Sequence, residues 1–283
     1  MVSTASLWNA CGAPAMKDLE QAELKQEWES YTPEQHAIWR TLFHRQEAIL
    51  ARRACQPFLD GLKALGVEAE GIPDFRRLNE ALERATRWGI VAVPGLVADD
   101  VFFEHLANRR FPSTCFIRRQ DQLDYLQEPD IFHDIFGHVP MLMNPVFADY
   151  MEAYGKGGLK ALQLHNLEHL ARLYWYTVEF GLIRTRDGIR IYGSGIVSSK
   201  GESIYCLEDK KPNRIAFDLL RVMRTRYRID DFQESYFVIE SFEQLFDATQ
   251  PDFTPYYSEL AGLSDLEPGE LLADDRLLQG NAA

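Results

Sequence analysis

Two histidines and one glutamate in this chain could together hold a metal ion. His133 and His138 lie five residues apart, and Glu179 follows later in the chain. Two imidazoles and one carboxylate, with no thiolate, form the facial triad that suits non-haem ferrous iron. Such a triad leaves coordination positions open for water, oxygen or a substrate, so these three residues are the candidate reaction centre.

The spacing of the two histidines is awkward for a regular helix, because five residues turn an α-helix by about 140°. Gly137 precedes His138 directly and Pro140 follows it closely, so we expect the helix to end or unwind there. His133 would then lie in the helix, and His138 at its loosened end could turn back to the same metal. Two core or helix-capping histidines would explain this pair equally well.

Glu179 lies in an apolar and aromatic stretch, residues 173–182, where a buried carboxylate is costly unless something balances its charge. A metal ion would balance it, and so would a salt bridge to an arginine. The metal also completes a ligand set with the two histidines. We therefore predict that His133, His138 and Glu179 bind iron.

A second histidine pair competes for a metal. His165, Glu168 and His169 match the inverted zincin pattern H-x-x-E-H, in which two histidines on one helical face bind zinc and the glutamate serves as base. The leucines and polar residues around them fit an ordinary amphipathic helix equally well. A zinc peptidase is therefore the alternative from another enzyme class, and a binding protein without catalysis is a third interpretation.

The bulk composition indicates an acidic protein that acts on a small molecule. The chain has 283 residues, 46% of them hydrophobic, which is enough for a large core, and its formal net charge is −13. This charge argues against a nucleic-acid partner and against a polybasic membrane contact. The N-terminus is no signal peptide, no apolar run could span a membrane, and we expect a cytoplasmic protein. The cysteines, which form no C-x-x-C pair and should be reduced, are Cys11, Cys55, Cys115 and Cys206.

Helices dominate the elements that must position the ligands. Thr32, Pro33 and Gln35 form a capping box that starts a helix running towards residue 65 with a break, and a second helix runs from Asp74 to a stop at Gly89. The other elements that we expect are helices over 99–108, 130–136, 147–154, 159–180 and 213–225, strands over 113–118 and 236–239, and strand and turn over 192–199.

The fold class that this pattern predicts is mainly α with small β pieces (α+β), in a single catalytic domain. No linker rich in proline, glycine or serine divides the chain. We expect a loose N-terminal arm over residues 1–20, a catalytic domain over 21–265 and an acidic, frayed tail over 266–283.

Four motifs of the chain resemble those of one enzyme family. Residues 129–140 resemble the iron-binding signature of the pterin-dependent aromatic amino acid hydroxylases, and residues 174–182 resemble the second signature of that family. Residues 192–202 and 232–241 resemble a third and a fourth motif, in the family's order and at matching intervals. The resemblance is greatest to the short bacterial members that hydroxylate phenylalanine, which lack the regulatory domain and the oligomerising helix of the animal members.

The resemblance implies a role for each matching residue. Iron would be held by His133, His138 and Glu179, with Asp134 reaching towards the pterin or bound water. The residues that would bind the substrate or lie beside it are Arg118, Trp175, Gly195, Ser198, Ser199 and Glu202. The residues that would contact the pterin by stacking or through the backbone are Gly95, Leu96, Val97, Phe102 and Tyr174.

Some of these assignments depend on the resemblance alone. Arg118 by itself would be a surface charge, and Phe102 by itself would be a core residue. Ser198 is the expected partner that orients His133. Leu126-Gln127 departs from the threonine-proline of the animal enzymes, which puts substrate contacts from that loop in doubt, and Asp134 stands where a glutamate is usual.

The family resemblance implies a monooxygenase that uses O2, ferrous iron and tetrahydrobiopterin or a related tetrahydropterin to hydroxylate an aromatic amino acid. Ile229 is apolar where a tyrosine-using relative would be expected to carry a carboxylate, so we expect L-phenylalanine as substrate and L-tyrosine as product. Tryptophan or tyrosine hydroxylation is the alternative within the family. Because the oligomerising helix is missing, we expect a monomer.

Overall fold

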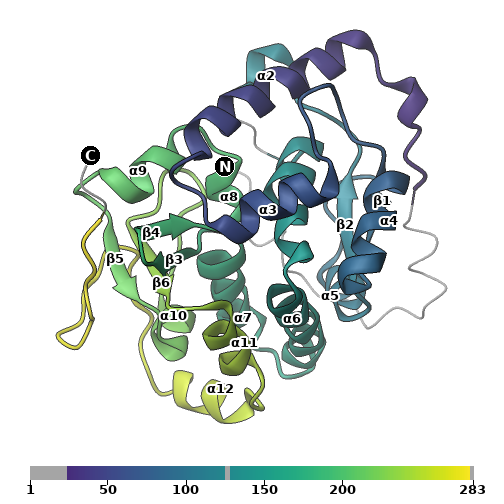
Figure 1. The fold of residues 1–283 in the computed structure, drawn as a ribbon. Helices are drawn as coiled ribbons and strands as arrows, with labels where there is room; N and C mark the ends of the chain where they lie inside the picture. The colour runs from purple at the N-terminus through teal and green to yellow at the C-terminus, as the bar shows by residue number, and fades with distance from the viewer. Residues whose placement is uncertain (1–23, 125–127, 281–283) are drawn as a thin grey trace.

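The computed structural model describes residues 24–124 and 128–280, and mainly helical structure surrounds two small sheets. Figure 1 shows the two sheets on opposite sides of the view, with α6 and α7 between them. The predicted fold class, mainly α with small β pieces, is therefore confirmed. Within the described residues, no helix is both long and apolar enough to cross a membrane. The predicted limits of the catalytic domain, 21–265, stay a prediction, and the arm over 1–20, Cys11 and Leu126-Gln127 lie outside the described residues.

The N-terminal half consists of helices around a two-stranded parallel sheet. Its strands are β1 (Gly89–Val93) and β2 (Arg110–Thr114), which pair from Gly89 with Arg110 to Val93 with Thr114. Its helices are η2 (Trp28–Ser30), α2 (Pro33–Leu50), α3 (Gln56–Leu65), α4 (Phe75–Thr86), α5 (Asp99–Ala107) and η3 (Gln120–Gln122). The predicted capping box at the start of α2 is present, because Thr32 and Gln35 bond each other's backbone amides.

The central part of the chain carries the predicted ligands. Its helices are η4 (Phe132–His138), η5 (Val139–Met143), α6 (Pro145–Gln163), α7 (Leu167–Tyr174) and η6 (Trp175–Glu179), and both η4 and η6 are π-helices. The long helix predicted over 159–180 is wrong, because α6 ends at Gln163 and His165 adopts the left-handed conformation with φ 54°. That conformation breaks a right-handed helix.

The C-terminal part builds a four-stranded sheet in the order β4-β3-β6-β5. Its elements are β3 (Leu182–Thr185), β4 (Gly188–Ile191), α8 (Ser194–Val197), α9 (Glu202–Glu208), β5 (Asn213–Ala216), α10 (Leu219–Arg224), β6 (Ser235–Ile239), α11 (Phe242–Thr249) and α12 (Thr254–Leu260). The helix predicted over 213–225 is wrong at its start, because Asn213–Ala216 pairs in parallel with Ser235–Val238. This pairing is non-local, so no local pattern reveals it. The predicted strand over 236–239 is confirmed as part of β6.

Two predicted boundaries and one predicted segment differ from the structure. The second helix ends before Gly89, because Arg87 takes the left-handed position with φ 61° and Gly89 already begins β1. The strand predicted over 113–118 ends at Thr114, where pairing with β1 ends. The stretch 192–199, predicted as strand and turn, contains the short helix α8 instead.

The tail after α12 lies against the C-terminal sheet. The amide of Ala216 donates to the carbonyl of Arg276, and the amide of Leu278 donates to the carbonyl of Arg214. The Arg221 guanidinium also binds the Asp275 carboxylate at 2.8 Å. Residues 266–280 are therefore attached to the fold where the sequence predicted a frayed end. The thiols of Cys55, Cys115 and Cys206 are free.

An aromatic cluster of the hydrophobic core packs against the first π-helix, η4. Phe132 and Phe136 of η4 stack with ring centroids 4.7 Å apart, and Trp39, Phe43 and Phe58 pack on them edge to face. All five rings are buried. One side of η4 is therefore fixed by close-packed aromatic contacts, which hold the opposite side in a defined position.

Candidate metal centre

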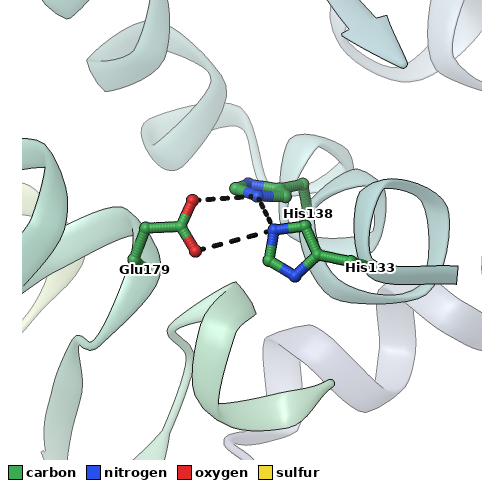
Figure 2. A group of neighbouring side chains, drawn as sticks. All are labelled: His133, His138 and Glu179. Carbon is green, nitrogen blue, oxygen red and sulfur yellow. Dashed lines mark hydrogen bonds and ion pairs between the residues drawn. The ribbon is translucent and has the colours of Figure 1, made fainter. Parts of the chain in front are cut away.

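The three predicted ligands converge on one point. The Nε2 atoms of His133 and His138 lie 3.1 Å apart, and the Glu179 carboxylate is 3.2 Å from His138 Nε2 and 3.7 Å from His133 Nε2. Figure 2 shows the two rings of η4 and the carboxylate of η6 pointing at each other. Among the described residues, this is the one group of three or more His, Cys, Asp or Glu side chains whose ligand atoms come within 4.8 Å of one another.

A π-helix solves the spacing problem of the two histidines. Its backbone bonds join residues five apart, so His133 and His138 lie nearly one above the other on the same side of η4. The helix does end at His138, as expected, but it does so as a π-helix that includes Gly137, and the 3-10 helix η5 begins at Val139. Glu179, which supplies the carboxylate, is the last residue of the second π-helix, η6. Both segments that supply ligands thus depart from α-helical geometry, as π-helices often do at functional sites.

Two serines, one at the start of the short helix α8 and one directly after its end, contact the ligands. Ser194 donates to Glu179 Oε2 at 2.9 Å, and Ser198 Oγ lies 2.9 Å from His133 Nδ1. Ser198 donates its only proton to the Ser194 carbonyl at 2.8 Å, so its oxygen is left to accept from His133 Nδ1–H. This arrangement selects the His133 tautomer whose Nε2 is free to bind a metal.

Small residues let α8 approach the ligands so closely. A Cβ atom on Gly195 would lie 3.1 Å from Glu179 Oε2, and a Cβ on Gly137 would lie 3.0 Å from the Ser194 carbonyl oxygen. Larger side chains at either position would push α8 away from the carboxylate. Gly195, predicted at the substrate's polar end or near the ligands, therefore lies beside the ligand Glu179.

The charges of the ligands suit a divalent cation. Burial raises the pKa of Glu179, but the adjacent imidazoles, His138 first, and the Ser194 hydroxyl outweigh it and bring the pKa down to about 2. Burial lowers the pKa of His133 to about 4, although Glu179 opposes this shift. At neutral pH the carboxylate is therefore ionised and His133 is neutral, which are the forms that bind metal ions. The donor set and its ionisation fit ferrous iron.

Asp134 lies inside the protein next to the ligands. Its Oδ2 accepts bonds from the amide and the hydroxyl of Thr114, at 2.8 and 2.9 Å. Burial raises the pKa of Asp134 to about 7, against the lowering effect of the Thr114 bonds. One carboxylate oxygen therefore anchors η4 to β2.

Arg118, the predicted substrate arginine, is held by a buried aspartate. Its Nε and Nη2 atoms both bind Asp130, at 2.8 Å each, and only 7% of the arginine surface is exposed. Asp130 also accepts from the backbone amide of His133 at 3.1 Å. Asp130, which sequence reasoning missed as a site residue, thus joins the arginine to the start of the ligand helix. Its signal was its place within the first motif, three residues before His133.

Three other predicted substrate residues, Trp175, Glu202 and Ser199, have defined partners in the structure. Trp175 stacks on Tyr227 with centroids 4.3 Å apart and bonds through its indole nitrogen to Gln233. Glu202 is buried and accepts from the Tyr236 hydroxyl at 2.6 Å. Burial raises the pKa of Glu202 to about 7. The Ser199 hydroxyl, by contrast, accepts from the amide of Glu202 within its own segment.

An aromatic chain leads from the metal ligands to the predicted pterin residues. The His138 ring lies 6.3 Å from the Tyr174 ring, which meets Phe102 edge to face at 5.8 Å. The loop containing Gly95, Leu96 and Val97 precedes α5, and Leu96 is 58% exposed. A Cβ atom on Gly95 would meet no atom within 4 Å, so space is open beside the loop.

Asp99 is a buried acid near this loop that sequence reasoning missed. It is only 7% exposed, and its Oδ2 atom has no hydrogen-bond partner among the described residues. Burial raises the pKa of Asp99 to about 7, and the nearby Asp100 adds to the shift. Acidic residues are common at helix starts, so the sequence offered no signal that set Asp99 apart.

The second histidine pair does not form a metal site within the described residues. His165 lies in the left-handed turn before α7, whereas His169 lies in α7 with its Nε2 4.0 Å from Asp265. Glu168, the supposed base, binds Arg172 at 2.6 Å. The zinc-peptidase alternative therefore lacks its shared helical face.

Comparisons with known proteins agree with this geometry. Residues 25–256 match the family model described as biopterin-dependent aromatic amino acid hydroxylase. The chain is 68% identical over 248 residues to phenylalanine-4-hydroxylase of Ralstonia nicotianae, covering 88% of this chain and 79% of the relative. It is 61% identical over 261 residues to phenylalanine-4-hydroxylase of Chromobacterium violaceum, covering 92% and 88%. The solved structure of the latter species' enzyme with bound iron and phenylalanine superimposes with a TM-score of 0.88 at 59% identity, covering 94% and 96% of the chains.

Proposed function

The chain belongs to the biopterin-dependent aromatic amino acid hydroxylases, and from this premise we propose that it hydroxylates L-phenylalanine to L-tyrosine. As a member of this family it is a monooxygenase that depends on iron and a tetrahydropterin. The observation that carries the proposal is the convergence of His133, His138 and Glu179 on one point in a chain this similar to enzymes that act on phenylalanine.

We propose that these three side chains hold the iron on one side only, which leaves the other side to the reactants. When bound, ferrous iron and a tetrahydropterin would activate O2 for hydroxylation of the aromatic ring. Ser198 keeps His133 in the tautomer that binds metal, and Ser194 orients the Glu179 carboxylate. The packed aromatic core beneath η4 keeps bulk water away from one side of the centre.

We propose that Arg118 binds the carboxylate of the amino acid substrate. A guanidinium can hold both carboxylate oxygens at once, and Asp130 fixes its plane from behind. Trp175 would form a wall for the substrate ring, with Ser199 and Glu202 nearby. Ile229 favours phenylalanine, because an apolar residue offers nothing to a ring hydroxyl. Tyrosine and tryptophan remain the alternative substrates within the family.

We propose that the pterin lies on the other side of the centre, where Phe102 offers a ring for stacking. The backbone of Gly95, Leu96 and Val97 would bind its polar edge, with Tyr174 between the pterin and His138. Asp134 would face this side through the oxygen that Thr114 does not use.

We also propose that the protein is a cytoplasmic monomer without nucleic-acid or membrane partners. The net charge of −13 supports this, since phosphate and anionic-lipid surfaces attract basic proteins. Free thiols at Cys55, Cys115 and Cys206 fit a reducing compartment. Light scattering at several protein concentrations would test the monomer, and a mass that doubles with concentration would contradict it.

The test of the main proposal is direct. Purified protein is loaded with ferrous iron and supplied with O2, a tetrahydropterin and each aromatic amino acid in turn, and the hydroxylated product is measured. We expect tyrosine from phenylalanine, with a kcat/KM well above that for tryptophan or tyrosine. Absence of tyrosine formation from an iron-loaded, folded protein would overturn the proposal, and a preference for tryptophan or tyrosine would replace phenylalanine as the substrate.

A further inference from the structure

Gln233 is a buried glutamine in the loop that precedes β6, and only 1% of its surface is exposed. Its side-chain nitrogen donates to the carbonyl of Arg228 at 2.7 Å, and its side-chain oxygen accepts from the amide of Arg228 at 3.3 Å. The same oxygen accepts from the indole nitrogen of Trp175 at 3.2 Å. One amide group therefore closes the loop 228–233 and ties it to Trp175.

The Gln233 amide joins two segments that we propose to lie beside the substrate, Trp175 and the loop 228–233. Trp175 begins the π-helix that ends with the ligand Glu179, and it is the proposed wall of the substrate pocket. Ile229, the residue that we propose favours phenylalanine, lies within the loop that Gln233 closes, and it is 49% exposed. Tyr227, just before this loop, stacks on the Trp175 ring with an interplanar angle of 17°. Any shift of the Gln233 amide would therefore move both the wall and the loop.

Gln233 is itself held in place from the other side. Its backbone amide donates to Glu202 Oε1 at 3.1 Å, and the Tyr236 hydroxyl donates to the same oxygen at 2.6 Å. Glu202 and Tyr236 are both buried. Gln233 therefore lies between the Glu202 carboxylate and the indole of Trp175, and its bonds to both fix its position.

The contacts at this position suit an amide. Its nitrogen donates to the Arg228 carbonyl while its oxygen accepts from Arg228 and Trp175, whereas a carboxylate accepts only and an alkyl chain does neither. The indole nitrogen of Trp175 is a donor only, so it needs the Gln233 oxygen. Because the Gln233 side chain is buried, a bond that its amide loses is not replaced by bulk water.

We propose that Gln233 is a positioning residue that sets the selectivity of the enzyme among aromatic amino acids, by locking Trp175 and the loop with Ile229 in one arrangement. The proposal rests on the hydroxylase function proposed above. When the amide is lost, the loop and the indole separate. The pocket then accepts rings of other sizes more readily and holds phenylalanine less well.

Two substitutions test the proposal. Gln233→Glu removes the donor, and Trp175→Phe keeps an aromatic ring but removes the N–H that Gln233 accepts. The ratio of kcat/KM for phenylalanine to kcat/KM for tryptophan is measured for each variant. We expect both to lower the ratio by roughly tenfold, the size of discrimination that pocket shape supplies, mainly through a higher KM for phenylalanine. Bound iron per chain should be unchanged.

The double variant and a matched control separate positioning from general stability. If the two side chains hold one arrangement of the pocket together, the double variant lowers the ratio by less than the product of the two single effects. Gln250→Glu makes the same chemical change at an exposed site and should leave the ratio unchanged. A ratio that stays at the wild-type value in both single variants would overturn the proposal, whether or not their melting temperatures fall.

Failure of this inference differs from failure of the proposed function. If the wild-type protein forms no tyrosine from phenylalanine, the function itself is wrong. If the wild type forms tyrosine and Gln233→Glu lowers kcat/KM equally for all substrates, the function stands and Gln233 has only a structural role. Trp175→Phe keeps the test decisive should the Gln233 variant not fold, since it introduces no buried charge.

Discussion

His133 and His138 have a spacing that a regular helix would direct apart, whereas His165 and His169 have a spacing that a helix brings onto one face. In the structure the relation is reversed. The Nε2 atoms of the first pair lie 3.1 Å apart. In the second pair, His165 itself has the left-handed conformation and therefore does not share a helix with His169.

The backbone explains the reversal. A π-helix from Phe132 to His138 places each residue above the one five positions before it, and a break after Gln163 leaves His165 outside α7. Side-chain spacing thus indicates a metal site only if the helix type is known. The surroundings differ as well: Ser198 contacts His133 of the first pair, whereas Arg172 forms a salt bridge with Asp265 next to His169 of the second.

The largest effect should come from the ligands of the first pair. We expect His138→Ala and Glu179→Ala each to abolish stoichiometric iron binding and to lower activity more than about 100-fold, because loss of mere outer contacts to ligands already costs 10- to 100-fold. Iron is measured by mass spectrometry after ferrous loading and desalting. His169→Ala is the control and should keep both iron and activity. If it loses iron too, the distinction between the pairs fails.

At the second pair, the largest effect should be on stability. Arg172 is 2% exposed and binds Asp265 at 2.7 Å and Glu168 at 2.6 Å. Arg172→Leu leaves the partly buried Asp265 carboxylate with only the exposed Arg226 as a cation, so we expect the free energy of unfolding to fall by about 3 kcal/mol. Urea unfolding measures this, and bound iron per folded chain should not change.

Arg226→Ala is the matched control for this change. Arg226 binds the same carboxylate, Asp265, at 3.2 Å, but its side chain is 55% exposed. An exposed pair of this kind contributes less than about 1 kcal/mol. If Arg172→Leu and Arg226→Ala lower the free energy of unfolding equally, burial of Arg172 is not what makes its salt bridge stabilising.

The same carboxylate should make stability depend on pH. The Arg172 guanidinium lowers the pKa of Asp265 from its ordinary 3.8 to about 2. A depressed pKa in the folded state means that the ion pair stabilises fully above about pH 4 and that this contribution is lost as the pH falls towards 2. The loss amounts to about 2 kcal/mol. Urea unfolding at several pH values should show a flatter profile for Asp265→Asn, and identical slopes would contradict the assignment.

The smallest of these effects concerns the orientation of a ligand. Ser198→Ala removes the acceptor for His133 Nδ1–H, so we expect the iron dissociation constant to rise about tenfold while the fold is retained. Ser258→Ala removes a hydroxyl that also donates to a carbonyl four residues earlier, but at an exposed site, and should change nothing. An unchanged iron affinity in Ser198→Ala would mean that the serine does not orient the ligand.

The sequence predicts those parts of the fold that depend on neighbouring residues. The capping box at Thr32 and the start of α4 after Asp74 are local signals, and both helices begin where they predict. β5 was missed because its pairing with β6 joins residues far apart in the chain. The end of α4 was shifted because Arg87, and not the nearby glycine, takes the left-handed position.

The site followed the same division. The ligand residues could be chosen from their types, their sequence motifs and the family resemblance, and the three side chains do converge. The π-helical form of η4 and η6 could not be foreseen, because no residue preference distinguishes it from an α-helix that ends at a glycine. Asp130 and Gln233 were missed because their function lies in bonds to residues that only the fold brings near.

The two π-helices also determine which genetic changes the chain tolerates. A π-helical turn holds one residue more than an α-helical turn, so deletion of one codon within 132–138 or 175–179 would restore a regular helix. The chain could keep its helices after such a deletion, and a deletion between His133 and His138 would leave them four residues apart, still on one face of a regular helix. In a library of variants, single-codon deletions within these two segments should therefore keep the fold more often than single-codon deletions within α2 or α6, where every later residue of the helix would rotate by about 100°.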